Sequence, residues 1–216
     1  GSFTTDEAKQ LAERIEAGSL PFALNAISSK GVGAKLGMDA LDTSIKAGVI
    51  GFIFILIFMV ALYRFSGMAS DIALVIYVAL LLIVLSLTSA TLTLPGIAGI
   101  ILSIGMAVDA NVIIFTRIKE ELAVGRSVRS AIDAGFNKAF SAILDGNVTT
   151  LIAAGVLYTL GSGVIKSFAT TLAIGIVVSM FTALVVTRIL LKLLVEMGID
   201  KPVLYGAKKH TEEGRA

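Results

Sequence analysis

Residues 96–118 read GIAGIILSIGMAVDANVIIFTRI, an apolar run that carries an acid, Asp109, and an amide, Asn111, near its middle. A helix rises about 1.5 Å per residue, so this run is long enough to cross the hydrocarbon core of a bilayer, which is about 30 Å thick. Asp109 then lies close to the midplane. Placing such a residue there costs at least about 2.5 kcal/mol, so it is expected to face protein or water and to serve a function.

The composition of the whole chain indicates an integral membrane protein. Of its 216 residues, 56% are hydrophobic and 16% are charged, and the mean hydropathy is +0.92. These values lie outside the usual range of soluble domains. Cysteine is absent, which excludes disulfides and thiolate metal sites, and the net charge of +2 gives no reason to expect a nucleic-acid partner.

Apolar runs of spanning length predict an all-α integral membrane fold with five transmembrane helices. The runs cover residues 47–63, 71–93, 96–118, 140–161 and 168–191. We expect residues 45–195 to form the transmembrane domain and residues 196–216 to form a tail. Lys and Arg are more numerous on the side of that tail, so the positive-inside rule places the C-terminus in the cytoplasm and the N-terminal block outside.

Residues 1–44 form a polar block ahead of the first run. Gly1-Ser2 is typical of a cloning remnant, and natural sequence is expected upstream. Thr4 and Glu7 match a capping box, which predicts an amphipathic helix ending near Gly18, and residues 22–27 read as a strand. One short helix and one strand bury too little to fold alone, so we interpret the block as an α/β remnant of a larger extracytoplasmic domain.

The link between the third and fourth runs, residues 119–138, carries apolar residues at helical spacing among its charges. The apolar positions are Val128, Ala131, Ile132, Phe136 and Ala139. This pattern predicts an amphipathic helix along the inner membrane surface. A solvated charged linker is an equally good interpretation.

Asp109 has two interpretations. As a structural residue it would be a permanently neutral or paired acid that pins neighbouring helices. As a functional residue it would bind and release protons or cations. Desolvation favours the neutral acid over the carboxylate, which brings proton exchange toward the physiological pH range. We favour the functional interpretation, since ionisable groups inside helical bundles often mark ion pathways. Moving one charge across the membrane supplies about 2.3 kcal/mol per 100 mV, which is enough to bias a conformational equilibrium.

A second polar cluster opens the fourth run and consists of Asp145, Asn147, Thr149 and Thr150. The third and fourth runs are antiparallel, so counting inward from their shared link puts both threonines near the depth of Asp109. They are candidates for the same proton pathway, together with Asp145. The alternatives are that each threonine bonds the carbonyl four residues earlier and that Asp145 only favours a helix N-terminus.

Other small and polar residues are expected to support helix packing. Asn111 lies about 200° around the helix from Asp109 and is expected to bond a neighbouring helix, and Asn147 is assigned the same supporting role. Gly105 precedes Asp109 by one turn and leaves space for another backbone. Gly175 belongs to a row of small residues at four-residue spacing, which is typical of a packing seam.

No motif of an enzyme is recognisable in the sequence. The single His210 has no partners for a metal site or a catalytic triad, and phosphate-binding loops and nucleophile elbows are absent. We therefore expect no enzymatic activity and no cofactor, with protons as the coupling ion.

Three stretches closely resemble the C-terminal membrane half of the SecD/SecF protein-export family, in its SecD branch, within the resistance-nodulation-division superfamily. They are LTLPGIAGIILSIGMAVDANVIIFTRIKEEL, AIDAGFNKAFSAILDGNVTTLIAAG and GSGVIKSFATTLAIGI. The resemblance implies an accessory subunit of the Sec translocon in the bacterial cytoplasmic membrane that uses proton flow to help move secreted polypeptides. It also implies that Asp109 lies on the proton pathway.

The same resemblance implies partners and missing parts. That half of the family has six spanning helices and a large extracytoplasmic domain after the first, so this chain would lack the first helix. The partners would be a homologous SecF half, the Sec channel and the secreted polypeptide. An incomplete bundle exposes a packing surface, so we expect the chain to self-associate. The alternatives are half of a proton-coupled small-molecule efflux transporter and a purely structural scaffold of the export channel.

Overall fold

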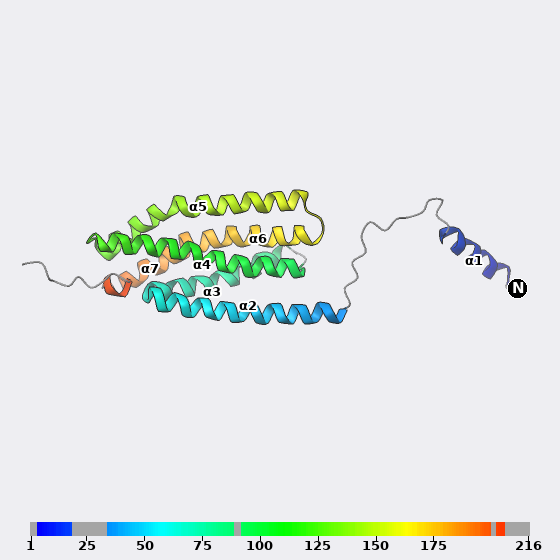
Figure 1. Ribbon diagram of the computed structural model, residues 1–216, viewed down its shortest axis with the longest axis horizontal. Coiled ribbons are helices and arrows are strands. Elements are labelled where there is room, and N and C mark those ends of the chain that lie inside the picture. The colour runs from blue at the N-terminus through cyan, green and yellow to red at the C-terminus, as the bar shows by residue number, and fades with distance from the viewer. Residues whose placement is uncertain (1–3, 19–33, 89–91, 200–201, 206–216) are drawn as a thin grey trace, which may run out of the picture. The chain divides into compact units, whose positions relative to one another are not determined.

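The structure is a computed structural model that describes residues 4–18, 34–88, 92–199 and 202–205. Its regular elements are all helical in these ranges (Figure 1). The strand expected at residues 22–27 lies outside the described residues. The chain divides into two compact units, residues 1–37 and 38–216, which are described separately.

Helix α1 (Thr5–Gly18) begins and ends where the capping pattern predicts. The Glu7 carboxylate accepts hydrogen bonds from the backbone N–H and the hydroxyl of Thr4, at 2.9 and 2.8 Å. These bonds favour the ionised form and lower the pKa of Glu7. The glutamate half of the capping box is therefore confirmed, because the Glu7 carboxylate accepts from the backbone N–H of Thr4 at the start of the helix.

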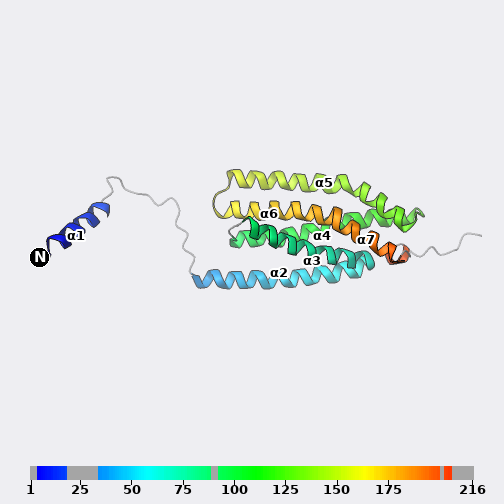
Figure 2. The same ribbon diagram turned by 180° about the vertical axis from the view of Figure 1, so that it is seen from behind.

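Five helical segments in the described part are long and apolar enough to cross a membrane, which confirms the all-α membrane fold. They are α2 (Ala34–Tyr63), α3 (Phe65–Leu87), α4 (Leu94–Ala123), α5 (Val128–Leu160) and the continuous run of α6 (Val164–Phe181), a π-helical turn (Thr182–Val186) and α7 (Thr187–Glu196). A short 3-10 helix, η2, follows at Pro202–Tyr205. In both ribbon views α2 and α5 lie at opposite edges of the bundle (Figures 1 and 2).

The turn between α2 and α3 differs from the prediction. Arg64 adopts a left-handed backbone conformation with φ of 49°, so α3 begins at once, at Phe65. The start expected at residue 71 is wrong, because the chain reverses at the single residue Arg64 and residues 65–70 are already helical. A Cβ on Gly67 would collide with the Met59 carbonyl, so glycine is required for the two helices to cross this closely.

The segment 119–138 is not a separate surface helix. Its first part completes α4, a short turn follows, and its second part forms the start of α5. The five apolar residues singled out in the sequence are all buried, so the helical face was predicted correctly. That face packs on protein rather than lipid, since a Cβ on Gly135 would collide with Ile118 of α4.

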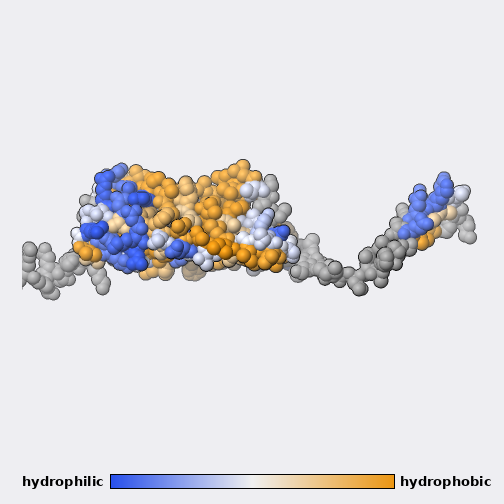
Figure 3. All heavy atoms as spheres, turned by 90° about the horizontal axis from the view of Figure 1, so that it is seen from above, coloured by the Kyte–Doolittle hydropathy of each residue, from blue (hydrophilic) through white to orange (hydrophobic). Residues whose placement is uncertain are grey.

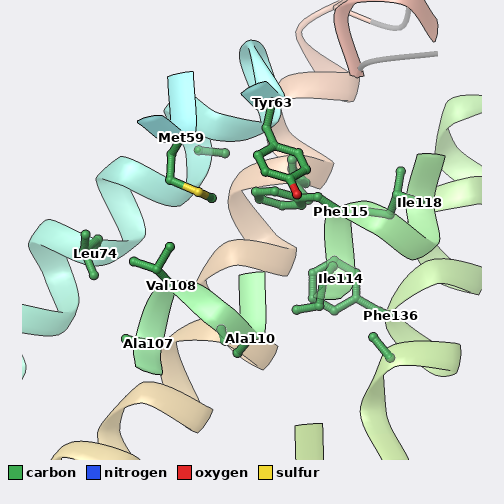
Figure 4. Close-up of a cluster of buried hydrophobic side chains, with 14 of the residues drawn as sticks. Met59, Tyr63, Leu74, Ala107, Val108, Ala110, Ile114, Phe115, Ile118 and Phe136 are labelled. Atoms are coloured by element: carbon green, nitrogen blue, oxygen red, sulfur yellow. The ribbon is translucent and has the colours of Figure 1, made fainter. Parts of the chain in front are cut away.

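Buried apolar side chains join α2 to α4 toward the C-terminal ends of both helices. Figure 4 shows Met59 and Tyr63 of α2 packed over Val108 and Phe115 of α4, and the rings of Tyr63 and Phe115 have centroids 5.3 Å apart. Lys119 lies over the Tyr63 ring at 4.2 Å and donates to the Leu62 carbonyl at 3.3 Å. These contacts attach the C-terminal end of α2 to α4.

Charged side chains gather at this same end of the bundle, whereas the middle of its surface is apolar (Figure 3). Two ion-pair groups organise them. Glu121, whose side chain is only 4% exposed, pairs with Arg126 and with Lys138. Asp133 of α5 pairs with Arg188 and Lys192 of α7, at 2.9 and 3.0 Å. The pairs connect α4 to α5 and α5 to α7.

Candidate functional site

Asp109 lies midway along α4 and borders a depression of about 270 Å³ between α4 and α5. The carboxylate is exposed on the described chain and has no hydrogen-bond or ion-pair partner among the described residues. The walls combine apolar and polar side chains from the two helices: Met106, Ala110, Ile113, Ala142, Ile143, Gly146, Asn147 and Thr150. An acid that pins helices within the described part of this chain would have a partner there, and Asp109 has none, so its carboxylate is open to the depression.

Thr150 is the threonine that shares the depression with Asp109. Its hydroxyl donates to the Gly146 carbonyl at 2.9 Å, which confirms the bond to the residue four positions earlier. A hydroxyl that donates its single proton in this way still has oxygen lone pairs that accept. Thr150 can therefore accept a hydrogen bond from water or from a protonated acid in the depression.

Thr149 and Asp145 lie outside that depression. The Thr149 hydroxyl donates to the Asp145 carbonyl at 2.8 Å, and both residues are exposed on α5. Asn147, by contrast, is buried beside the depression and donates to the Ile143 carbonyl at 2.8 Å. Of the cluster read from the sequence, the structure brings Thr150 and Asn147 to Asp109, and a proton role for the other two stays a prediction.

Asn111 bonds a neighbouring helical segment, as its position predicts. It is 3% exposed, and its Oδ1 accepts a hydrogen bond of 3.0 Å from the hydroxyl of Thr187, which is fully buried at the start of α7. Its side-chain amide makes only a long contact, 3.5 Å, with the Ala107 carbonyl. The bond to Thr187 joins α4 to α7 on the face of α4 opposite Asp109.

The two glycines of the packing prediction differ in their surroundings. A Cβ on Gly175 would collide with the Ser103 side chain, so α6 and α4 approach here as closely as the row of small residues predicts. Nearby, Tyr77 donates to Ser103 at 2.8 Å. Gly105 has no described atom within 4 Å of its Cβ position and borders an apolar cavity of about 400 Å³ between α2 and α4. The approach of another backbone to Gly105 stays a prediction.

Sequence reasoning missed Asp71, which it placed at the start of a span. Because α3 begins at Phe65, Asp71 lies inside the helix, and its Oδ1 is buried without a hydrogen-bond partner in the described ranges. The sequence feature that could have placed it there is a run of small residues before Asp71, namely Ser66, Gly67, Ala69 and Ser70. These residues are all buried, and they belong to α3. The π-helical turn was missed as well.

Comparison with known proteins identifies the family. Residues 15–197 match the family described as "Protein export membrane protein SecD/SecF, C-terminal". The chain is 53% identical over 209 residues to the protein translocase subunit SecD of Acidaminococcus fermentans, covering 96% of this chain and 50% of that protein. It is 52% identical to SecD of Synechocystis over 90% of this chain and 41% of that protein.

A solved structure agrees with these sequence matches. The crystal structure of SecDF from Thermus thermophilus, described as a translocon-associated membrane protein, superposes with a TM-score of 0.78 at 41% identity, over 92% of this chain and 28% of that protein. The chain thus spans about half or less of the length of these relatives. It belongs to the SecD/SecF protein-export membrane family, of which it represents the C-terminal membrane portion of SecD.

Proposed function

We propose that this chain is the membrane part of a SecD-type accessory subunit, which helps secreted polypeptides cross the bacterial cytoplasmic membrane through the Sec translocon. In this proposal, proton binding at Asp109 couples export to the proton-motive force. The observation that carries the proposal is the open depression at Asp109, halfway along the membrane-length helix α4. There the acid, which has no partner among the described residues, lies beside Thr150 of α5.

The composition of the depression supports a proton site. Intramembrane acids are costly and commonly serve ion pathways. Thr150 and Asn147 supply polar atoms beside the acid, and a depression of about 270 Å³ has room for water. The depression is open, and Asp109 is exposed beside it, which suits completion by a homologous SecF half that supplies the remaining groups of the path.

The distribution of charge supports an orientation. Lys119, Arg126, Arg129, Lys138, Arg188 and Lys192 belong to the end of the bundle where α4 meets α5 and where α7 ends. Positive residues in short connections favour the cytoplasmic side. We therefore infer that this end and the C-terminus face the cytoplasm.

The test is Asp109→Asn in the full-length protein, assayed for protein export driven by a proton gradient across inverted membrane vesicles. Asp145→Asn is the matched control, because it neutralises an acid of α5 that lies outside the depression. The proposal gives Asp145 no part in the coupling, although the sequence made it a candidate for the same pathway. The proposal expects Asp109→Asn to abolish the stimulation of export by the gradient and Asp145→Asn to retain it. Stimulation that survives in Asp109→Asn would refute the coupling role.

A scaffold is the second candidate, and it makes a different prediction. A purely packing role for Asp109 would be preserved by Asn and lost with Leu. The absence of any partner for its carboxylate among the described residues counts against this candidate.

A further inference from the structure

The π-helical turn at Thr182–Val186 interrupts an otherwise continuous helix between α6 and α7. The Thr187 backbone N–H bonds the carbonyl of Thr182, five residues earlier, instead of the usual four. Single π turns inside α-helices are rare and are frequent at functional sites. The π turn is therefore a candidate for a functional role.

The extra residue sets the direction of Thr187. One residue corresponds to about 100° of rotation in an α-helix, so a regular turn here would carry the Thr187 side chain far around the axis. With the π turn, the Thr187 hydroxyl donates to Asn111 Oδ1 at 3.0 Å and also lies 3.3 Å from the Thr182 carbonyl. Both Thr187 and Asn111 are buried, so the contact is shielded from solvent.

This bond holds α4 at the level of Asp109. Asn111 follows Asp109 by two residues and lies on the opposite side of α4, where it meets Thr187. On the other side the Asp109 carboxylate has no partner among the described residues. The bond between Thr187 and Asn111 therefore restrains the rotation of α4 about its axis at the depth of Asp109.

We propose that Thr187, directed by the π-helical turn, is a positioning residue that fixes the rotation of α4 through Asn111 and thereby presents Asp109 to the depression. Its importance for transport rests on the proposed function, but its effect on α4 does not. Thr187 contacts neither the depression nor Asp109 and acts only through the helix that it restrains.

The test uses the absence of cysteine from the chain, which allows a single thiol probe. Ala107→Cys places this probe on α4 at a position that is 3% exposed and outside the depression. The rate of its reaction with N-ethylmaleimide is measured in the 216-residue chain in phospholipid vesicles.

The same probe is combined with Thr187→Val, Thr187→Ser and Thr170→Val. Thr170 is the matched control, because its hydroxyl bonds only the Lys166 carbonyl of its own helix.

The proposal expects Thr187→Val to raise the labelling rate about tenfold, while Thr187→Ser and Thr170→Val stay within about twofold of the parent. Deletion of the exposed Val185, which removes the extra residue of the π turn, should act like Thr187→Val. A rate for Thr187→Val within twofold of the parent would overturn the proposal, and so would failure of Thr187→Ser to restore the parental rate.

Folding is checked by size-exclusion chromatography of each variant. If Thr187→Val is not monodisperse, the smaller Thr187→Ala is judged by the same criteria, and failure of both variants to fold overturns the positioning role in favour of a folding role. Labelling reports how closely α4 is held at Ala107 and does not depend on export. Altered labelling together with unimpaired export in Asp109→Asn would therefore remove the proposed function and leave this inference standing.

Discussion

Asp109 of α4 and Thr150 of α5 line the same depression, although they are 41 positions apart in the chain and no hydrogen bond joins them. The Thr150 hydroxyl already donates to its own helix at 2.9 Å, so it is left as an acceptor beside the acid. This arrangement leaves room for a water molecule or a mobile proton between the two groups.

Replacing Thr150 with Val should therefore slow gradient-driven export about fivefold, because it removes an acceptor worth about 1 kcal/mol from the depression. Thr149→Val is the control, since that hydroxyl also bonds its own helix but lies outside the depression. Export assays on both variants of the full-length protein compare them directly. Equal rates for the two variants would argue against a role for Thr150.

Gly175→Ala should destabilise the bundle by about 1–3 kcal/mol, because the added Cβ collides with Ser103 and forces α6 away from α4. Gly155→Ala is the control. Gly155 has open space around its Cβ position, and its replacement should be neutral or slightly stabilising. Unfolding in mixed micelles gives both free energies. A stable Gly175→Ala variant would contradict the close approach of these helices.

Asn111 and Thr187 should show a coupling free energy of about 0.6–1.7 kcal/mol in a double-mutant cycle of alanine substitutions, as interhelical hydrogen bonds in membranes do. The same cycle made with Asn111 and Thr170 should give a value near zero, because Thr170 bonds only its own helix. Additive effects of Asn111 and Thr187 would show that the 3.0 Å contact contributes no stability.

Glu121→Gln should cost more stability than Glu120→Gln, although the two residues are adjacent. The Glu121 side chain is buried and pairs with two cations, whereas Glu120 forms an exposed pair with Arg117. We expect a clear loss for the first, because two cations lose their shared anion, and little or no loss for the second, because exposed ion pairs contribute little. Thermal unfolding of both variants measures the two losses of stability. A loss for Glu121→Gln no larger than that for Glu120→Gln would contradict the prediction.

Hydropathy and helical spacing predicted the spans and their buried faces because both depend on local composition. Val128 and Phe136 are buried as expected, yet α5 continues without a break from that region across the membrane. A separate surface helix was predicted because charged residues interrupt the apolar run. The structure accommodates charges such as Asp133 and Lys138 in ion pairs with neighbouring helices, which a single sequence does not reveal.

The site was predicted in part for the same reason. Depth counting along antiparallel helices places Thr149 and Thr150 level with Asp109, yet only Thr150 lines the depression. Asp145, which the count places nearer the inner surface, also lies outside it. Depth is readable from the sequence, but the rotation of each helix depends on tertiary contacts. The position of Asp71 depends on the left-handed conformation of Arg64. The π turn at Thr182–Val186 accompanies a contact between Thr187 and Asn111, which lie 76 positions apart in the chain.

The central claim is that the Asp109 carboxyl group gains and loses a proton inside the membrane. Infrared difference spectroscopy of the full-length protein with its partner subunit in lipid vesicles tests it directly, by following the carbonyl band of protonated carboxyl groups while a proton gradient is imposed. We predict a band whose intensity changes with the gradient, which disappears in Asp109→Asn and persists in Asp145→Asn. A band that stays constant, or one that changes equally in Asp109→Asn, would contradict the account.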